Sequence, residues 1–106
     1  MGLAFKENCP DLRNSKVADV VSELVKYGAT VDVWDPWVSA KEARHEYGIR
    51  LVKKPARNRY DAIVVAVAHR QFKAMKLAEL RRLAKRKHVL YDIKYVFSRQ
   101  EADGRL

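Results

Sequence analysis

Apolar residues recur near the start of the chain at the spacing of an amphipathic helix. The positions that carry this spacing are Val17, Val20, Val21 and Leu24. They follow one another at i, i+3, i+4 and i+7, which gathers them on one face of a helix. Ser15 is a favourable N-cap residue and Gly28 a favourable stop. The pattern therefore predicts a helix between Ser15 and Gly28.

Two short apolar segments further along the chain have the composition of strands. Residues 30–34 predict a short buried strand. It should end at Asp35, because the following Pro36 cannot continue a ladder and restricts the residue before it. Residues 49–52 predict an edge strand.

A second helix is predicted between these two strands. Ser39 and Glu42 have the spacing of a capping box, in which each side chain bonds the backbone of the other residue. The helix should run to about Tyr47 and stop at Gly48, because glycine is the usual residue just past a helix.

The second half of the chain contains the longest apolar run. Residues 53–59 predict a polar surface loop, and DAIVVAVAH at 61–69 predicts a strand covered on both faces. A longer helix should follow, with an apolar side formed by Leu77, Leu80, Leu83 and Ala84. Its outer side would carry Arg81, Arg82, Lys85 and Arg86. HVLYDI at 88–93 predicts the last strand, and a polar tail should begin at about Ser98.

Helices that alternate with buried strands are typical of an α/β fold, in which a parallel sheet is covered by helices on both faces. A chain of 106 residues and 12.3 kDa fits one such domain, residues 1–106. Ligands of these folds bind at the carboxyl ends of the strands. The loops that begin there are therefore the places to search for chemistry.

Composition narrows the location and the class of partner. No apolar run approaches the roughly 18 residues of a membrane helix, and one cysteine cannot form an internal disulfide. We therefore expect a cytoplasmic protein without a membrane partner. The net charge of +9 is uneven: residues 1–52 hold 7 Lys/Arg and 8 Asp/Glu, whereas residues 53–106 hold 15 and 5. This basic half indicates a polyanion partner or a face that a missing acidic partner covers.

A series of motifs resembles a known family. In order they are GLAFKENCPDLRNSKV at 2–17, VDVWDPWV at 31–38, AVAH before Phe72, and YDIKYVF at 91–97. Together they are similar to the C-terminal, UDP-binding domain of the UDP-glucose/GDP-mannose dehydrogenase family, over nearly the whole chain. The first motif looks most like the branch that oxidises UDP-N-acetylhexosamines, such as UDP-N-acetylgalactosamine, for surface polysaccharides. The resemblance implies a three-layer αβα, Rossmann-like parallel sheet.

The resemblance also implies what this chain lacks. Intact family members have an N-terminal domain that binds NAD, a central dimerisation region and a catalytic cysteine in the N-terminal part. Nothing here matches that cysteine segment, and we interpret Cys9 as a half-buried structural residue. We therefore expect no cofactor in this chain and no catalysis by it alone. A separate N-terminal dehydrogenase half is one predicted partner.

The family has a central strand before the first loop, and here Met1 stands where that strand would end. The two neighbouring strands would keep unpaired backbone groups, which is costly when they are buried. We hypothesise that residues 2–6 fill the position as a substitute strand, or that two chains form a homodimer across their open sheet edges.

The opening loop is the predicted binding site. A loop that leaves a central strand and enters a helix presents backbone N–H groups, which suit a pyrophosphate. The resemblance implies that Phe5 and Lys6 contact a UDP-sugar, and that Lys94 is a further substrate-binding residue. It also implies that Arg13 reaches toward the NAD of the absent domain. The alternative for Arg13 is an ion pair with Asp11 or Asp35 that shapes the loop.

Four residues near the strand ends have more ordinary interpretations. Asp35 follows a strand and should form a turn, and a histidine at a strand end, such as His69, is more often structural than functional. Trp34 and Trp37 could stack on a base, but space-filling between helix and sheet is the simpler interpretation.

The leading prediction is thus a UDP-sugar-binding domain derived from an NAD-dependent UDP-sugar 6-dehydrogenase. One alternative is a basic interaction module that binds nucleic acid or an acidic protein through the helix around 81–87. The lack of a nucleic-acid recognition motif argues against a nucleic-acid partner. The other alternative is a folded dimer that has lost its ligand. Binding to a phosphate backbone would weaken steeply with salt, whereas UDP-sugar binding would depend on Lys6.

Overall fold

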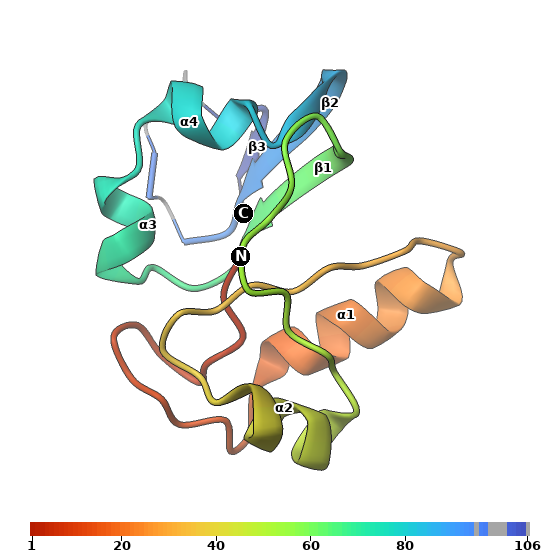
Figure 1. Cartoon of the computed structure of the whole chain (residues 1–106), viewed down its shortest axis with the longest axis vertical. Coiled ribbons are helices and arrows are strands. Elements are labelled where there is room, and N and C mark those ends of the chain that lie inside the picture. The colour runs from red at the N-terminus through yellow and green to blue at the C-terminus, as the bar shows by residue number, and fades with distance from the viewer. Residues whose placement is uncertain (95, 98–101, 106) are drawn as a thin grey trace.

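A computed structural model describes residues 1–94, 96, 97 and 102–105 of the chain. The elements are α1 (Lys16–Lys26), α2 (Ala40–Tyr47), β1 (Tyr60–Val65), α3 (Arg70–Ala74), α4 (Leu77–Arg81), β2 (Ala84–Asp92) and β3 (Gly104–Arg105) (Figure 1). β2 lies between β1 and β3, and both pairings are parallel. The predicted α/β class with a parallel sheet is confirmed.

The two N-terminal helices lie where the sequence predicts them. Ser15 is the N-cap residue of α1, although its hydroxyl donates to the carbonyl of Leu3 at 2.5 Å and does not cap the helix. Ser39 Oγ accepts the N–H of Glu42 at 3.3 Å at the start of α2. Gly48 ends α2 with a φ of 66°, a left-handed conformation that glycine adopts without strain.

The strands predicted at 30–34 and 49–52 are much shorter in the structure. Only Val33 and Leu51 form a parallel bridge, which the N–H of Val52 supports with a 2.9 Å hydrogen bond to the carbonyl of Val33. The other edge of residues 30–33 borders an open groove that α1 and β1 also line, and an extended segment needs partners on its edges to form a regular ladder.

β1 is also shorter than its apolar sequence predicts, because residues 66–69 leave the strand. Ile63 and Val65 are buried, but Asp61 and Ala62 are exposed. The prediction of a strand covered on both faces is therefore wrong for the first half of β1, where the same groove leaves one side open.

The predicted long helix over the basic segment is wrong. α3 and α4 are short, and the chain is already in β2 at Ala84. The carbonyl of Leu83 accepts the N–H groups of Arg59 and Tyr60 at 2.9 and 3.2 Å, which draws the chain alongside β1. This pairing overrides the helical spacing of the leucines. Lys85 and Arg86 thus lie on an exposed part of a strand and not on a helix.

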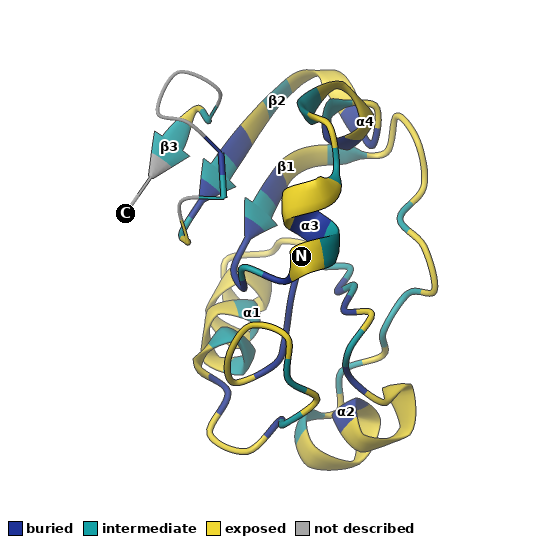
Figure 2. Ribbon diagram, turned by 90° about the vertical axis from the view of Figure 1, so that its left-hand side faces the viewer, coloured by how far each residue is buried: buried dark blue, intermediate teal, exposed yellow. Residues whose placement is uncertain are grey.

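The buried residues form two separate clusters. Cluster 1 lies around β1 and β2 and contains Ile63, Val65, Phe72, Leu80, Leu83, Ala84, Leu90 and Phe97. Cluster 2 lies around α2 and the Val33–Leu51 bridge and contains Leu3, Ala4, Leu12, Val33, Val38 and Ala43. Figure 2 shows the contrast with α1, whose surface is largely exposed and which has no buried residue.

The start of the chain bonds the region around cluster 1 to the region around cluster 2, but it does not fill the space between them. The Met1 amine donates to the carbonyl of Val64 at 2.6 Å and the Met1 carbonyl accepts the N–H of Ala66 at 2.9 Å. On the other side, the N–H of Gly2 donates to the carbonyl of Trp34 at 2.8 Å. From Leu3 on the chain turns away, so the hypothesis that residues 2–6 form a substitute strand is wrong.

The end of the chain is described only in part. Of the predicted polar tail, 98–101 and 106 lie outside the described residues, whereas β3 pairs with the end of β2. The division of residues 1–106 into one domain with a tail stays a prediction. Within the described part of the chain, every helix is too short or too polar to cross a membrane.

Candidate functional site

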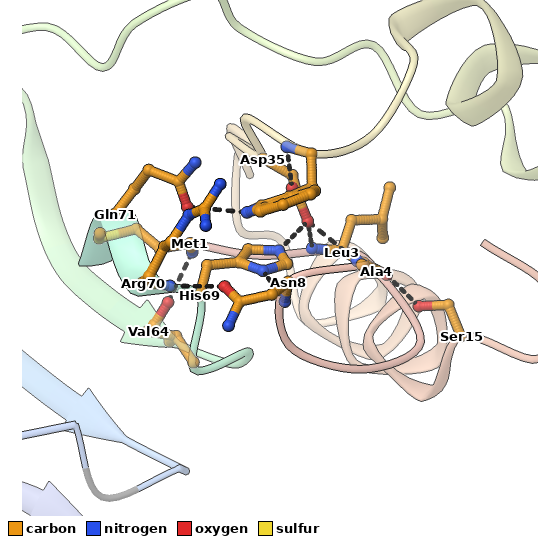
Figure 3. A network of polar contacts seen from close by, with 11 residues as sticks. Met1, Leu3, Ala4, Asn8, Ser15, Asp35, Val64, His69, Arg70 and Gln71 are labelled. Carbon is orange, nitrogen blue, oxygen red and sulfur yellow. Dashed lines mark hydrogen bonds and ion pairs between the residues drawn. The ribbon is translucent and has the colours of Figure 1, made fainter. Parts of the chain in front are cut away.

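A buried carboxylate holds the start of the loop at residues 3–8. Asp35 Oδ2 accepts the N–H groups of Leu3 at 2.7 Å and Ala4 at 2.9 Å (Figure 3). Its Oδ1 accepts the N–H of Trp37 at 2.8 Å and so closes the turn that the sequence predicts. Because the Asp35 side chain is fully buried, this one group fixes both the turn after residue 34 and the direction of the loop.

His69 completes this network from the other region of the molecule. Its Nε2 lies 2.9 Å from Asp35 Oδ2, and its Nδ1 accepts the N–H of Asn8 at 2.9 Å. A ring that accepts at Nδ1 is neutral and donates from Nε2. Both nitrogens are thus used within the protein, and the imidazole is fully buried. The structural interpretation of His69 is confirmed by this geometry.

Asn8 anchors the far end of the loop. Its side-chain Oδ1 accepts the N–H of Arg70 at 2.8 Å, at the start of α3. Its backbone has a φ of 53°, which asparagine tolerates better than most residues. The N–H of Phe5 donates to the carbonyl of Asp11 at 2.7 Å and closes the loop at its middle. The loop is therefore fixed at both ends and once between them.

The two residues predicted to contact a UDP-sugar lie at the exposed tip of this loop. Phe5 is 54% exposed, and Lys6 is exposed beside it. Phe5 and Lys6 are thus presented to solvent by a fixed backbone.

The Arg13 side chain pairs with Asp11. Arg13 Nε and Nη2 contact the two carboxylate oxygens of Asp11, both at 3.1 Å. The hydrogen bond from Arg13 lowers the pKa of Asp11, and the charge of Lys6 lowers it further. Of the two carboxylates predicted as alternatives, Asp11 is the partner, since Asp35 is occupied by His69. The role of Arg13 toward NAD stays a prediction.

Lys94 lies at the same edge of the sheet, in the turn after β2. A second buried carboxylate shapes this turn, because Asp92 accepts the N–H groups of Lys94 at 3.2 Å and Phe97 at 2.7 Å. Lys94 itself is exposed. The carboxyl ends of β1 and β2 are neighbours, so the topology brings Lys94 to the edge from which the loop at 3–8 projects.

Three residues at this edge are missed by the sequence analysis: Asn8, Arg70 and Asp92. The Arg70 guanidinium lies 4.9 Å from the centre of the Trp37 ring, and Trp37 Nε1 donates to Gln71 Oε1 at 2.7 Å. Trp37 is thus occupied by protein contacts, in agreement with its space-filling interpretation. A sequence signal exists for Asp92 alone: like Asp35, it is a single carboxylate at the end of an apolar strand.

Cationic side chains dominate the exposed part of this edge. Lys6, Arg70 and Lys94 are exposed there and outnumber the one exposed carboxylate of the loop, Glu7, whereas the carboxylates of Asp35 and Asp92 are buried and bonded. Such an arrangement favours an anionic ligand. No group of three or more metal-ligating side chains occurs in the described residues, and Cys9 is half-buried as predicted.

The sequence of the chain is similar to those of known proteins. Residues 1–99 match the model of the UDP-glucose/GDP-mannose dehydrogenase family, UDP binding domain. The chain is 57% identical over its whole length to a UDP-N-acetyl-D-glucosamine 6-dehydrogenase of Pseudomonas aeruginosa, and 54% identical to one of Salmonella typhi. It is 36% identical over 95% of its length to Protein CapL of Staphylococcus aureus. The chain spans about a quarter of the length of these curated relatives.

Proposed function

The chain belongs to the UDP-glucose/GDP-mannose dehydrogenase family as its UDP binding domain, and from this premise we propose that the loop at 3–8 and the turn after β2 bind a UDP-sugar. Lys6 supplies a positive charge to the diphosphate, Phe5 packs against the ligand, and Lys94 adds a second cation from the neighbouring strand end. Arginine and lysine contacts to phosphate are among the stronger hydrogen bonds in proteins.

One observation carries this proposal: the loop tip is exposed while its base is bonded to buried Asp35 and His69. A binding loop that is already ordered loses little conformational entropy when the ligand arrives. The cationic edge adds attraction for the diphosphate. A loop with a fixed base and an exposed cationic tip is suited to binding an anion.

The names of the relatives narrow the proposed ligand class. Two of them are named UDP-N-acetyl-D-glucosamine 6-dehydrogenase, so we propose a UDP-N-acetylhexosamine as the ligand, in the context of polysaccharide biosynthesis. The chain spans about a quarter of these relatives. We propose that it does not catalyse oxidation alone, and that NAD is bound by other parts of a complete enzyme.

Calorimetric titration of the chain with UDP, UDP-N-acetylglucosamine and UDP-N-acetylgalactosamine tests this function. We expect saturable binding, and Lys6→Ala should weaken it roughly 10- to 150-fold, which is about 1.5 to 3 kcal/mol for a charge-assisted contact. Lys41→Ala is the matched control, since Lys41 is an exposed lysine of α2 and belongs neither to the loop at 3–8 nor to the turn after β2. Equal affinities for the two variants would exclude Lys6 from the site.

Several finer expectations stay predictions. They include contact of Arg13 with NAD, a separate N-terminal dehydrogenase half as partner, a homodimer through the open sheet edges, and a cytoplasmic location. A dilution series by light scattering tests the homodimer. The alternative of a basic helix that binds nucleic acid or an acidic protein loses its premise, because residues 84–92 form β2.

A further inference from the structure

A depression with basic side chains lies between α2 and the segment that follows it. It is open to solvent, has a volume of about 760 Å³ and is lined by Ala40, Lys41, Arg44, His45, Arg50 and Leu51. Figure 2 shows that most of the surface of α2 is exposed. The lining consists of basic residues and two apolar ones, and we name this place the α2 depression.

The backbone that carries these side chains is held in place. Ala43, within α2, is fully buried and anchors the helix. Past the helix, the N–H of Ile49 donates to the carbonyl of Ala43 at 3.3 Å, and the N–H of Val52 donates to the carbonyl of Val33 at 2.9 Å. Arg50 lies between these two bonds. The backbone of Arg50 is therefore fixed relative to α2, and the depression exists before any partner arrives.

The basic side chains of the α2 depression have no acidic partner among the residues that the structure describes. Other exposed cations of the chain pair with carboxylates, as Arg13 does with Asp11 and Lys85 with Asp61. Within the described residues, no such pair includes Lys41, Arg44, His45 or Arg50. The acidic residues of α2, Glu42 and Glu46, do not line the depression. Its positive charge is thus available to a partner from outside.

Helix stability explains only part of this set of basic residues. Arg44 and His45 lie in the last turn of α2, where the helix dipole favours positive charge. Lys41 lies in the first turn, where the same dipole disfavours it, and its spacing to Arg44 brings two like charges together. Arg50 lies outside the helix. The positions of Lys41 and Arg50 therefore call for another reason.

The apolar part of the lining narrows the class of partner. Ala40 is exposed and Leu51 is half-buried. A free phosphate anion would leave these two side chains in water, whereas a peptide can cover them with an apolar side chain and place carboxylates beside the basic groups. Recognition of acidic motifs by clustered arginines is a recurring mode of peptide binding. Each arginine can bind a carboxylate through two parallel hydrogen bonds.

We infer that the α2 depression binds an acidic segment of another polypeptide, which places an apolar side chain against Leu51 and carboxylates beside Arg44 and Arg50. The charges of the segment attract it to the depression, and the apolar contact selects one register of the segment. The inference does not rest on UDP-sugar binding, because no lining residue belongs to the loop at 3–8 or to the turn after β2. It also concerns a different surface from the basic segment at 81–87.

A synthetic peptide with a central leucine, flanked on each side by a short run of glutamates and blocked at both ends, tests the inference. The matched control peptides have serine in place of the leucine, or glutamine in place of every glutamate. We expect saturable one-to-one binding of the first peptide by calorimetry at low ionic strength, with an affinity that falls as salt is added. The serine peptide should bind roughly fivefold more weakly or worse, and the glutamine peptide should not bind.

Two variants of the chain test the position of the site. Arg44→Ala should weaken peptide binding roughly tenfold. Arg86→Ala, which removes the same charge from an exposed position of β2 outside the lining, should leave it unchanged. Both side chains are exposed, and circular dichroism verifies that both variants fold.

Four results would each overturn the inference. They are no binding of the first peptide by the folded chain, equal binding of the serine peptide, equal affinities of the Arg44→Ala and Arg86→Ala variants, and displacement of the peptide by less tripolyphosphate than unlabelled peptide. The last result would assign the depression to phosphate anions, because tripolyphosphate carries charge without an apolar group.

Discussion

The two regions of the molecule contain similar apolar segments and yet differ in structure. In the first region, around cluster 1, β1 and β2 form a continuous parallel ladder, and Ile63 and Val65 are buried. In the second, around cluster 2, the segment at 30–34 also contains apolar residues, Val31, Val33 and Trp34, but forms a single bridge at Val33. The difference teaches that strand formation depends on the neighbouring strand more than on the apolar sequence itself.

The link between the two regions combines polar contacts with the packing of Trp34 against Phe72, whose ring centres lie 5.3 Å apart. Asp35 belongs to the second region and His69 to the first, and the two are joined 2.9 Å apart. Met1 bonds Val64 and Ala66 of the first region, and Gly2 bonds Trp34 of the second. Stability and the shape of the proposed binding loop should therefore depend on few residues.

The largest effect is expected from Asp35→Ala. The change leaves the N–H groups of Leu3, Ala4 and Trp37 and the ring of His69 without their acceptor in a buried place. We expect a loss of roughly 3 to 5 kcal/mol in the free energy of unfolding, measured with urea. Asp61→Ala, on an exposed side chain, is the control and should stay within about 0.5 kcal/mol. A similar midpoint for both variants would show that the regions are joined by other contacts.

Two leucine substitutions compare how much each region contributes to stability. Leu80 in α4 is fully buried, whereas Leu24 in α1 is 37% exposed. Leu80→Ala should reduce the free energy of unfolding by about 2 to 5 kcal/mol, and Leu24→Ala by less than about 1 kcal/mol. Thermal and urea unfolding measure both. Equal losses would mean that the α1 stripe is covered in solution.

The Met1 amine makes the junction sensitive to pH. Burial lowers the pKa of this ammonium to about 6, although the charge of Asp35 partly offsets the effect. The unfolded chain, with its ordinary pKa near 8, binds the proton more readily in this interval. Stability should therefore be greatest above pH 8 and fall by up to about 2.7 kcal/mol as the pH drops to 6. The difference between the free and the N-acetylated chain isolates this effect, and identical pH profiles would contradict it.

The smallest effect concerns the bond across the groove. Tyr60→Phe removes the hydrogen bond to Asp32 and should cost about 0.5 to 1.5 kcal/mol. Burial, and then the bond to Asp32, raise the pKa of Tyr60, so the hydroxyl remains a donor in mildly alkaline solution. Tyr27→Phe is the control, because Tyr27 is 86% exposed. Unfolding free energies that do not differ between the two variants would show that the bridge adds nothing.

The sequence by itself determined what depends on local patterns. The apolar spacing and Gly28 placed α1, the Ser39 cap and Gly48 set the bounds of α2, the alternation of helix and strand indicated the α/β class, and the spaced motifs identified the family. The turn at Asp35 was also predictable, because a carboxylate after an apolar strand and before proline has few other local roles. These features depend on residues that are close together in the chain.

Only the tertiary structure decided how long each strand is and what holds the loop. The pairing of Leu83 with Arg59 and Tyr60 turned a helical pattern into the approach to β2, and the open groove shortened the strand at 30–34. The contact of Asp35 with His69 joins residues 34 positions apart. No local pattern encodes such contacts, because their energy depends on which distant backbone and side-chain groups are brought together and which remain without a neighbour.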